Sequence, residues 1–294
     1  MRLRAYDEAA ARKAARLWFV REVDVQLLGH SAASVYRAGP AVLRLGDPRL
    51  RSSAQVTAEM RFVAEVKRRG EVRVAGPLRS RAGSYVEEVD GAVVSVIEWA
   101  PGIKVSEPPA VCDDVLAAWG RSLAGVHEAA RVVAPEVAAA RWWWEDEVWL
   151  VEGPRLCKDD AVLREWQAVR AHLAARPRSH TGLIHGDLGP QNFHADGARL
   201  TLFDFGNCCR HFFAMDLAIA WTLLRGREPD QRRRAWRVLL DAYQAAAPLP
   251  EDELAEVGWL ARLRAVYVYF SRLWAYGKVE ERIRARVGLD DWVV

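Results

Sequence analysis

The chain has 294 residues, of which 51% are hydrophobic and 28% are charged, a composition typical of globular proteins. This length favours one large domain or two smaller ones. The formal net charge of +3 is small and the basic residues are interspersed with acidic ones, so the charge pattern argues against a nucleic-acid-binding protein.

The cysteines and the apolar segments bear on the cellular compartment. Cys112 and Cys157 stand alone and Cys208 is followed by Cys209, a spacing that forms neither a disulfide framework nor a zinc motif. The charged N-terminal residues are not followed by an apolar run, which argues against a signal peptide. Arg or Glu interrupts the most apolar stretches before they reach the length of a membrane span. We therefore expect a cytoplasmic protein without a membrane partner.

The first third of the chain combines strand and helix signals. Asp7 is a predicted cap for a helix of strong helix formers that begins at Glu8. A second helix is predicted over 53–69, because its apolar residues recur at helical spacing and Gly70 follows it. Strands are predicted on both sides of this helix, at residues 23–28, 34–36, 41–45, 73–78, 84–89 and 93–99.

The periodicity changes after Pro101-Gly102, which ends the last of these strands. Beyond that point the predicted helices cover residues 111–128, 159–175, 214–224, 231–246 and a long C-terminal segment. A short β-like and turn-like stretch, Leu183–Asn207, lies among them. The sequence thus predicts an α+β protein of two lobes. Residues 1–98 would form a small, mainly-β lobe and residues 99–294 a larger helical one, with a ligand cleft between them.

Two polar motifs occupy the β-like stretch. His185–Asp187 and Asn192 follow one apolar strand, and Asp204–Gly206 follows the next. A Gly-Pro turn folds the first motif back on itself, and a hairpin would bring Asp204 beside Asp187. Phosphoryl transfer needs such a set: one carboxylate accepts the proton of the attacking hydroxyl, while a second carboxylate and an amide oxygen hold Mg²⁺. Oxygen ligands without sulfur suit Mg²⁺ rather than zinc.

These motifs resemble the protein-kinase signature H-R-D-x-x-x-x-N and D-F-G, with Gly186 in the place of the arginine. The His-Gly-Asp form resembles the aminoglycoside phosphotransferases, the type II homoserine kinases and the choline kinases, and the likeness covers nearly the whole chain. The resemblance implies a bilobal protein-kinase-like fold and an ATP- and Mg²⁺-dependent transfer to a hydroxyl. It also implies that Asp187 is the catalytic base, that Asn192 and Asp204 bind the metal, and that His185 braces the loop.

The same resemblance implies a basic residue on the third strand that contacts nucleotide phosphates and pairs with a helix glutamate. Arg44 takes the place of the usual lysine, and Glu59 is its expected partner, with Glu65 as a rival. A surface role for Arg44 is the alternative.

Two further segments are candidates for nucleotide binding. The turn at residues 29–34 lacks a glycine-rich phosphate motif, but its backbone and the hydroxyls of Ser31 and Ser34 are candidates for phosphate contacts; an ordinary hairpin turn is the alternative. Glu98, Trp99 and Ala100 resemble the hinge whose backbone binds adenine.

Other residues are open to a structural or a functional interpretation. Asp216 resembles the aspartate that braces the catalytic loop, and His127 resembles a structural histidine at a helix end. Trp142–Trp144 either line a substrate pocket or pack in the core. The acidic group within 251–256 either faces a cationic substrate or forms the acidic first turn of the last helix.

The spacing after the second motif bears on the phosphate acceptor. About ten positions separate Gly206 from Asp216 and no A-P-E follows, which leaves no room for the peptide-docking segment of protein kinases. We therefore expect a hydroxyl acceptor that is a small metabolite or aminoglycoside-like. A bacterial Ser/Thr protein kinase of the same branch and a nucleotide-binding pseudokinase are the alternatives.

Overall fold

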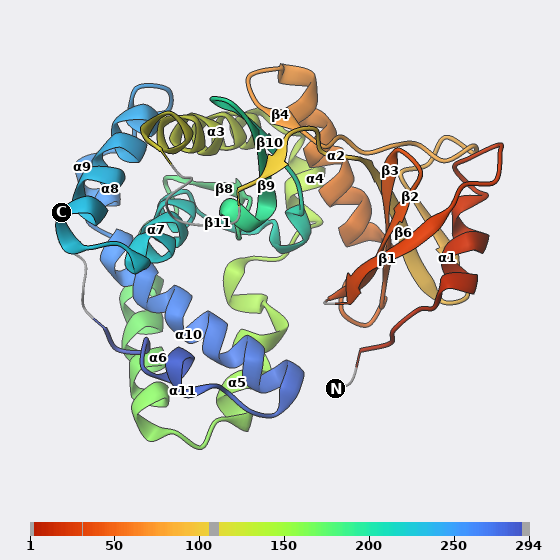
Figure 1. Cartoon of the computed structure of the whole chain (residues 1–294). Coiled ribbons are helices and arrows are strands. Elements are labelled where there is room, and N and C mark those ends of the chain that lie inside the picture. Colours follow the sequence, from red (N-terminus) through yellow and green to blue (C-terminus); the bar gives the residue numbers. More distant parts are fainter. Residues whose placement is uncertain (1–2, 31, 106–111, 290–294) are drawn as a thin grey trace.

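The computed structural model describes residues 3–30, 32–105 and 112–289 (Figure 1). Its N-terminal part is a five-stranded antiparallel sheet with the strand order β1-β2-β3-β6-β5. The strands are β1 (Val25–His30), β2 (Ala33–Ala38), β3 (Ala41–Gly46), β5 (Val86–Val89) and β6 (Ala92–Glu98). This sheet and the larger helical part stand on opposite sides of Figure 1.

A helix covers each face of this sheet. Along β6, Val94 and Val96 pack in one apolar cluster with α1 (Glu8–Ala15), whereas Val93 and Ile97 pack in another with α2 (Ser53–Arg69). Successive strand residues point to opposite faces, which explains why β6 is buried almost throughout. The carboxylate of Asp7 caps α1 as expected.

The C-terminal part is a set of helices around two small sheets. The helices are α3 (Asp113–Val132), α4 (Pro135–Ala139), α5 (Val148–Leu156), α6 (Asp160–Ala174), α7 (Ala214–Leu223), α8 (Pro229–Gln244), α9 (Glu251–Leu254), α10 (Val257–Tyr276) and α11 (Glu281–Arg284). None of the helices among the residues that the structure describes combines the length and the apolar character needed for a membrane span.

The two small sheets carry the segments that surround the two polar motifs. One has the order β4-β10-β9-β7 and the other pairs β11 with β8. Their strands are β4 (Arg73–Val74), β7 (Ile103–Lys104), β8 (Thr181–Ile184), β9 (Phe193–Asp196), β10 (Arg199–Leu202) and β11 (Cys209–Phe212). The sequence assigns β4 to the first lobe, but its partner is β10. The N-terminal segment is therefore tied to the second motif by backbone hydrogen bonds.

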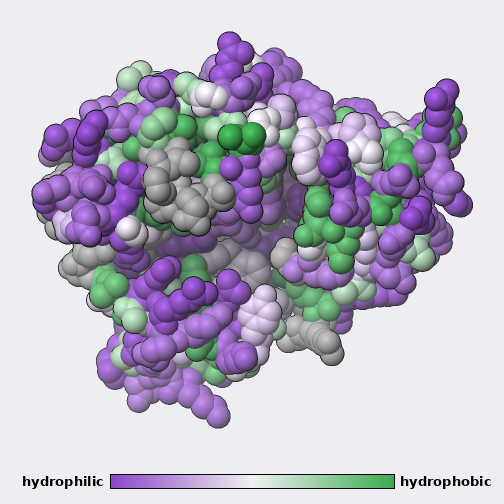
Figure 2. All heavy atoms as spheres, viewed as in Figure 1, coloured by the Kyte–Doolittle hydropathy of each residue, from purple (hydrophilic) through white to green (hydrophobic). Residues whose placement is uncertain are grey.

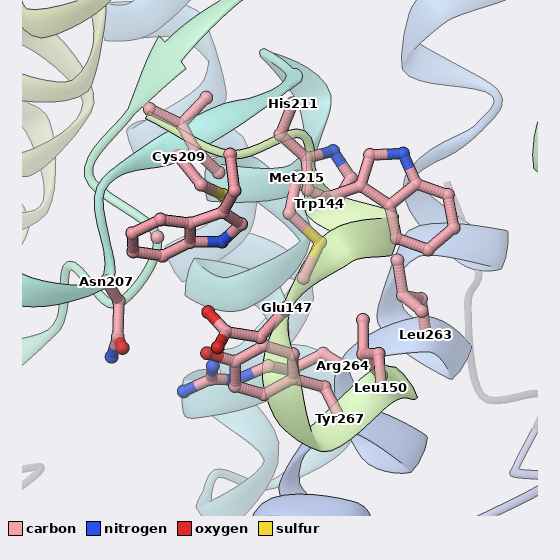
Figure 3. A pocket seen from close by; sticks show the side chains of 13 residues that line it. Trp144, Glu147, Leu150, Asn207, Cys209, His211, Met215, Leu263, Arg264 and Tyr267 are labelled. Carbon is pink, nitrogen blue, oxygen red and sulfur yellow. The ribbon is translucent and has the colours of Figure 1, made fainter. Parts of the chain in front are cut away.

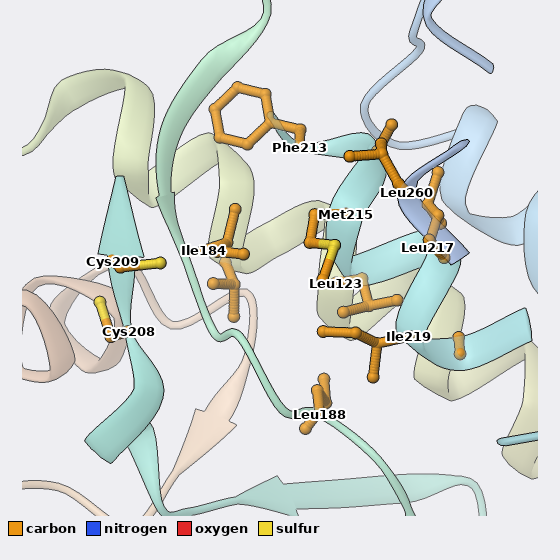
Figure 4. Packing of buried hydrophobic residues seen from close by; sticks show 14 of the residues in the cluster. Leu123, Ile184, Leu188, Cys208, Cys209, Phe213, Met215, Leu217, Ile219 and Leu260 are labelled. Carbon is orange, nitrogen blue, oxygen red and sulfur yellow. The ribbon is translucent and has the colours of Figure 1, made fainter. Parts of the chain in front are cut away.

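Apolar packing holds the loop between β8 and β9 against α7 and α10. Figure 4 shows Ile184 and Leu188, at either end of the first motif, among side chains of α7 and α10 that include Ile219 and Leu260. All four side chains are at most 1% exposed. The polar residues between Ile184 and Leu188 are consequently held on a rigid base.

The expected α+β fold is confirmed, but the sequence did not predict the short helices α4 and α5. α5 contains Pro154, which removes a backbone donor and argues against a helix. Tertiary packing stabilises the helix in spite of the proline. Gly153 lets α5 approach the ring of Phe270 on α10 so closely that a Cβ at this position would lie 2.4 Å from the ring.

Candidate active site

The backbone of the first motif is held by Asp216 at the start of α7. Its carboxylate accepts hydrogen bonds from the N–H groups of His185 and Gly186, both at 2.9 Å. His127 on α3 contacts the same carboxylate at 3.2 Å and the Tyr243 hydroxyl at 2.8 Å. Burial raises the pKa of Asp216, but the bond to His127 and the other partners hold it below its ordinary value. Asp216 is therefore a charged anchor for the loop.

Asp187 and Asn192 lie together, as the turn between them predicts. The Asn192 amide nitrogen donates to the Asp187 carbonyl at 2.8 Å and to its Oδ2 at 3.2 Å. The other carboxylate oxygen, Oδ1, accepts from Nη2 of Arg264 on α10. The Asp187 side chain is 24% exposed, so a small molecule can reach it.

His185 joins the first motif to the second. Its Nε2 lies 3.1 Å from the carbonyl of Phe203, and its ring packs against Phe205 with the centroids 4.3 Å apart. Asp204, between these two, has the left-handed backbone φ of 62° that Asp tolerates better than most residues. His185 thus contacts the backbone rather than the reacting groups.

The donor set around the two motifs suits a hard divalent cation. The nitrogen of the Asn192 amide is used by Asp187, which leaves its oxygen to face a cation, and Asp204 supplies a carboxylate. In the parts of the chain that the structure describes, no group of three or more His, Cys, Asp and Glu side chains has the arrangement of a metal site. A carboxylate with an amide oxygen fits Mg²⁺ or Ca²⁺ and argues against zinc.

Arg44 and Glu59 form the expected ion pair between β3 and α2. Nη1 of Arg44 lies 2.6 Å from Oε1 of Glu59, whose side chain is 1% exposed. Burial lowers the pKa of Arg44, but the carboxylates of Glu59 and Asp204 outweigh this and raise it. The rival, Glu65, instead pairs with Arg68 on the surface. Arg44 is therefore an inward-facing cation close to Asp204, and the surface alternative is wrong.

Arg141 is a third member of this cluster that the sequence did not reveal. Its side chain is fully buried, and it donates to the carbonyls of Cys208 at 2.7 Å, Gln55 at 2.9 Å and Gly206 at 3.0 Å. Its Nη1 also lies 3.6 Å from Glu59. One guanidinium thus joins α2 to the backbone that follows Asp204.

The two serines predicted to contact phosphate lie outside this cluster. Ser31 lies outside the described residues. Ser34 is 1% exposed, and its hydroxyl accepts from the Tyr6 N–H at 2.9 Å and contacts His30. This side chain therefore belongs to the interior of the sheet, which is not where a phosphate contact would be made.

The hinge-like segment is held by other parts of the protein. The N–H of Glu98 donates to Gly76 and that of Trp99 to Pro40, at 2.9 and 3.1 Å. The carbonyl of Ala100 lies 2.9 Å from Nδ1 of His194. An adenine that binds here must therefore meet other backbone atoms of the segment.

A pocket that is partly open to solvent borders Asp187 through Gly186 and Arg264 (Figure 3). Aromatic and aliphatic side chains form most of its wall. The lining residues are Trp142, Trp144, Glu147, Leu150, Ile184, Gly186, Asn207, Cys209, His211, Met215, Leu263, Arg264 and Tyr267. In Figure 3 the polar ends of Glu147 and Arg264 lie on the opposite side of the pocket from His211.

The tryptophans at 142–144 are divided between the pocket wall and the core. Trp142 and Trp144 line it, whereas Trp143 packs on Phe212 and lies under the guanidinium of Arg178. All three are buried, as core packing predicts, and two of them also line the pocket. The acidic group at 251–256 does not line this pocket, because Glu256 faces His172 on α6 and Glu253 faces Arg176, which follows that helix.

Figure 2 shows that the molecular surface in this view is mainly hydrophilic and is hollowed between the sheet and the helices. The most informative residues missed from the sequence are Arg141, Glu147 and Arg264. Each is a charged residue on a helix or in a loop far along the chain from its partner, and none stands in a motif.

Comparison with known proteins agrees with this geometry. Residues 25–253 match the phosphotransferase enzyme family APH. A homoserine kinase of Nitrobacter winogradskyi is 34% identical over 67% of this chain, and one of Xanthobacter autotrophicus is 30% identical over the same share. The chain spans 61% and 62% of the length of these two relatives.

Solved structures share the fold. An amicoumacin kinase in complex with AMP-PNP, Ca²⁺ and Ami has a TM-score of 0.83 at 24% identity, over 95% of this chain and 90% of that one. A microcompartment-associated aminopropanol kinase has a TM-score of 0.75 at 19% identity, over 95% and 93%. At these identities the likeness establishes the protein-kinase-like fold.

Proposed function

Because the chain belongs to the phosphotransferase enzyme family, we propose that it transfers the γ-phosphate of ATP to a hydroxyl group of a small molecule. The observation that carries the proposal is the position of Asp187. Its carboxylate bonds Asn192 on one side and, on the other, Arg264, which lines a mainly apolar pocket.

In this proposal Asp187 is the catalytic base. The acceptor oxygen bonds to the γ-phosphorus, the bond from that phosphorus to the bridging oxygen breaks, and ADP leaves with the electrons of that bond. The proton of the hydroxyl goes to the Asp187 carboxylate. Asp216 keeps the loop in place through the N–H groups of His185 and Gly186.

Asn192 and Asp204 would hold the divalent cation, for which Mg²⁺ is the expected ion. When bound, it neutralises charge on the phosphates. Arg44 would contact the phosphates, with Glu59 and the Asp204 carboxylate fixing its direction. The segment 98–100 would meet the adenine, at the boundary between an N-terminal lobe, 1–98, and a C-terminal lobe, 99–294.

The acceptor is proposed to be a small molecule rather than a protein. β11 begins at Cys209 and pairs at once with β8, so the chain has no extended segment there on which a peptide would dock. The relatives and structural neighbours named for homoserine, amicoumacin and aminopropanol add support, since each of these is a small molecule.

The test is an ADP-release assay with Mg²⁺-ATP and pools of acceptors: hydroxy amino acids, amino alcohols, sugars, nucleosides, aminoglycosides and a generic protein. We expect one small-molecule pool to release ADP. Asp187→Asn should lower kcat by a factor of about 10³ or more while leaving the affinity for ATP nearly unchanged. Asp204→Ala should abolish turnover and the dependence on the cation.

The matched control is Asp196→Asn, because Asp196 lies at the end of β9 between the two motifs and its side chain is 69% exposed. It should retain full activity. Unimpaired turnover in Asp187→Asn would remove Asp187 as the base. Labelling of the generic protein alone would favour a protein kinase, and tight ATP binding without ADP from any pool would favour a pseudokinase.

A further inference from the structure

Both carboxylate oxygens of Asp187 are occupied by protein donors. Asn192 donates to Oδ2 at 3.2 Å, and the guanidinium of Arg264 donates to Oδ1. An acceptor hydroxyl must hydrogen-bond this carboxylate before it can give up its proton. Asn192 also bonds the Asp187 main chain at 2.8 Å and is fixed by the loop, so Arg264 is the partner that the hydroxyl would displace.

Displacement would leave the positive charge of Arg264 without its carboxylate partner. Its side chain is 15% exposed, and a guanidinium so far removed from water is stable only with a new anionic partner. Arg264 lies on α10 and lines the pocket that borders Asp187, so the partner has to be a group within that pocket.

Glu147, the other charged residue in the pocket wall, cannot become the new anionic partner of Arg264. Both oxygens of Glu147 bond Nη2 of Arg51, at 3.0 and 2.8 Å, and Oε1 also accepts from the Val148 N–H at 3.0 Å. Its side chain is 3% exposed. Among the described residues that line the pocket, Glu147 is the only acid, so the wall has no carboxylate to offer to a cationic acceptor.

Resting on the proposed function, we propose that Arg264 exchanges Asp187 for an anionic group of the acceptor. The acceptor is then a small alcohol that also carries a carboxylate. Its carboxylate binds the guanidinium of Arg264, and its hydroxyl takes the vacated position at Asp187 Oδ1. The aromatic wall formed by Trp142, Trp144 and Tyr267 encloses the carbon chain between the two groups. On this proposal we expect no transfer to a polycationic aminoglycoside, because the one acid among the described residues of the wall, Glu147, is already paired.

The test compares hydroxy acids with their uncharged carboxamides. L-Homoserine, L-serine, L-threonine and 4-hydroxybutanoate, and the four matching amides, are titrated calorimetrically into the full chain with Mg²⁺ and a non-hydrolysable ATP analogue. At least one acid should bind about tenfold to a hundredfold more tightly than its amide, the range of a hydrogen bond to a charged group. Arg264→Gln should reduce this ratio to about one by weakening the acid alone, and Arg264→Lys should retain part of it.

Arg262→Gln is the matched control. Arg262 lies two positions earlier on α10 and bonds Glu165 on α6, away from the pocket. The acid-to-amide ratio of this variant should equal that of the unmodified chain. Thermal unfolding of each variant checks that the fold is retained.

Three outcomes overturn the inference: no acid binds, an acid binds no better than its amide, or the preference survives in Arg264→Gln. Weaker binding of the ATP analogue in Arg264→Gln, without an acid preference in the unmodified chain, assigns the guanidinium to the γ-phosphate instead. ADP release measured with ATP separates the two proposals. Arg264-dependent binding of an acid without ADP release retains the anion site and rejects the kinase reaction. ADP formed equally well with acids and amides retains the kinase reaction and rejects the anion site.

Discussion

A Cβ atom added to Gly186 would lie 2.4 Å from the carbonyl oxygen of Asn207. The two residues belong to the loop after β8 and to the turn after Asp204, so the segments that carry the two motifs lie backbone to backbone. Gly186 also has a φ of +79°, which side chains other than glycine rarely adopt. Together these explain why glycine stands where protein kinases have arginine.

Gly186→Ala should therefore separate the two segments. We expect kcat to fall about a hundredfold or more and the free energy of unfolding to fall by about 2–4 kcal/mol, of which the left-handed backbone accounts for about 1–2 kcal/mol. Gly197→Ala is the matched control, because Gly197 has a φ of +57° but no atom within 4 Å of the Cβ position. Equal losses in the two variants would mean that the contact with Asn207 is unimportant.

Replacement of Arg44 should act on nucleotide affinity. Its Nη1 bonds Glu59 at 2.6 Å, while Nη2 lies 3.2 Å from the Cβ position of Gly206, beside Asp204. A lysine ammonium cannot reach both places, so Arg44→Lys should raise the KM for ATP about tenfold and Arg44→Met about a hundredfold, as steady-state kinetics would reveal. Arg12→Met, which removes an exposed pair with Glu8, should leave that KM unchanged. An unaltered KM in Arg44→Met would exclude Arg44 from the nucleotide site.

Loss of Arg141 should affect both stability and cation binding. Arg141→Met leaves three carbonyls without their donor and Glu59 with one cation fewer, so the free energy of unfolding should fall by about 3–5 kcal/mol. Since two of these carbonyls follow Asp204, the cation concentration needed for half-maximal turnover should rise in the protein that remains folded. Arg61→Met, which removes a surface pair with Glu136, should cost less than about 1 kcal/mol. Destabilisation with an unchanged cation requirement would restrict Arg141 to a structural role.

The buried imidazole of His211 should make the protein less stable in mild acid. Burial lowers its pKa from 6.5 to about 3, so between these pH values the unfolded chain binds a proton that the folded chain does not. The free energy of unfolding should therefore fall as the pH decreases from 6.5 towards 3, by about 2 kcal/mol from this residue at pH 5. His211→Asn retains an acceptor for the Phe212 N–H and removes the titration. Denaturant unfolding at pH 7 and pH 5 should show a smaller pH effect in this variant, and an equal one would refute the assignment.

The sequence was sufficient for most of the helices and strands and for the two motifs. The helix at 53–69 and the strands on either side were predicted because their patterns are local, and α2 ends at Gly70 with a left-handed backbone. Asp187 and Asn192 were predicted to meet because a short turn joins them, and their hydrogen bonds confirm it. Arg44 and Glu59 followed from a strand-and-helix order that the family resemblance supplied.

What the sequence determined by itself is the set of residues whose partners lie within one turn, one hairpin or one motif. The tertiary structure alone decided the partners of Arg141 and Arg264. Arg264 lies 77 positions from Asp187, and Lys and Arg together number 42 in the chain, so no local pattern distinguishes this arginine from the rest. Its place beside Asp187 depends on the packing of α10 against α5, α6 and α7. Contacts so distant along the chain arise only when apolar faces are buried together, and that burial, rather than any motif, formed the pocket beside Asp187.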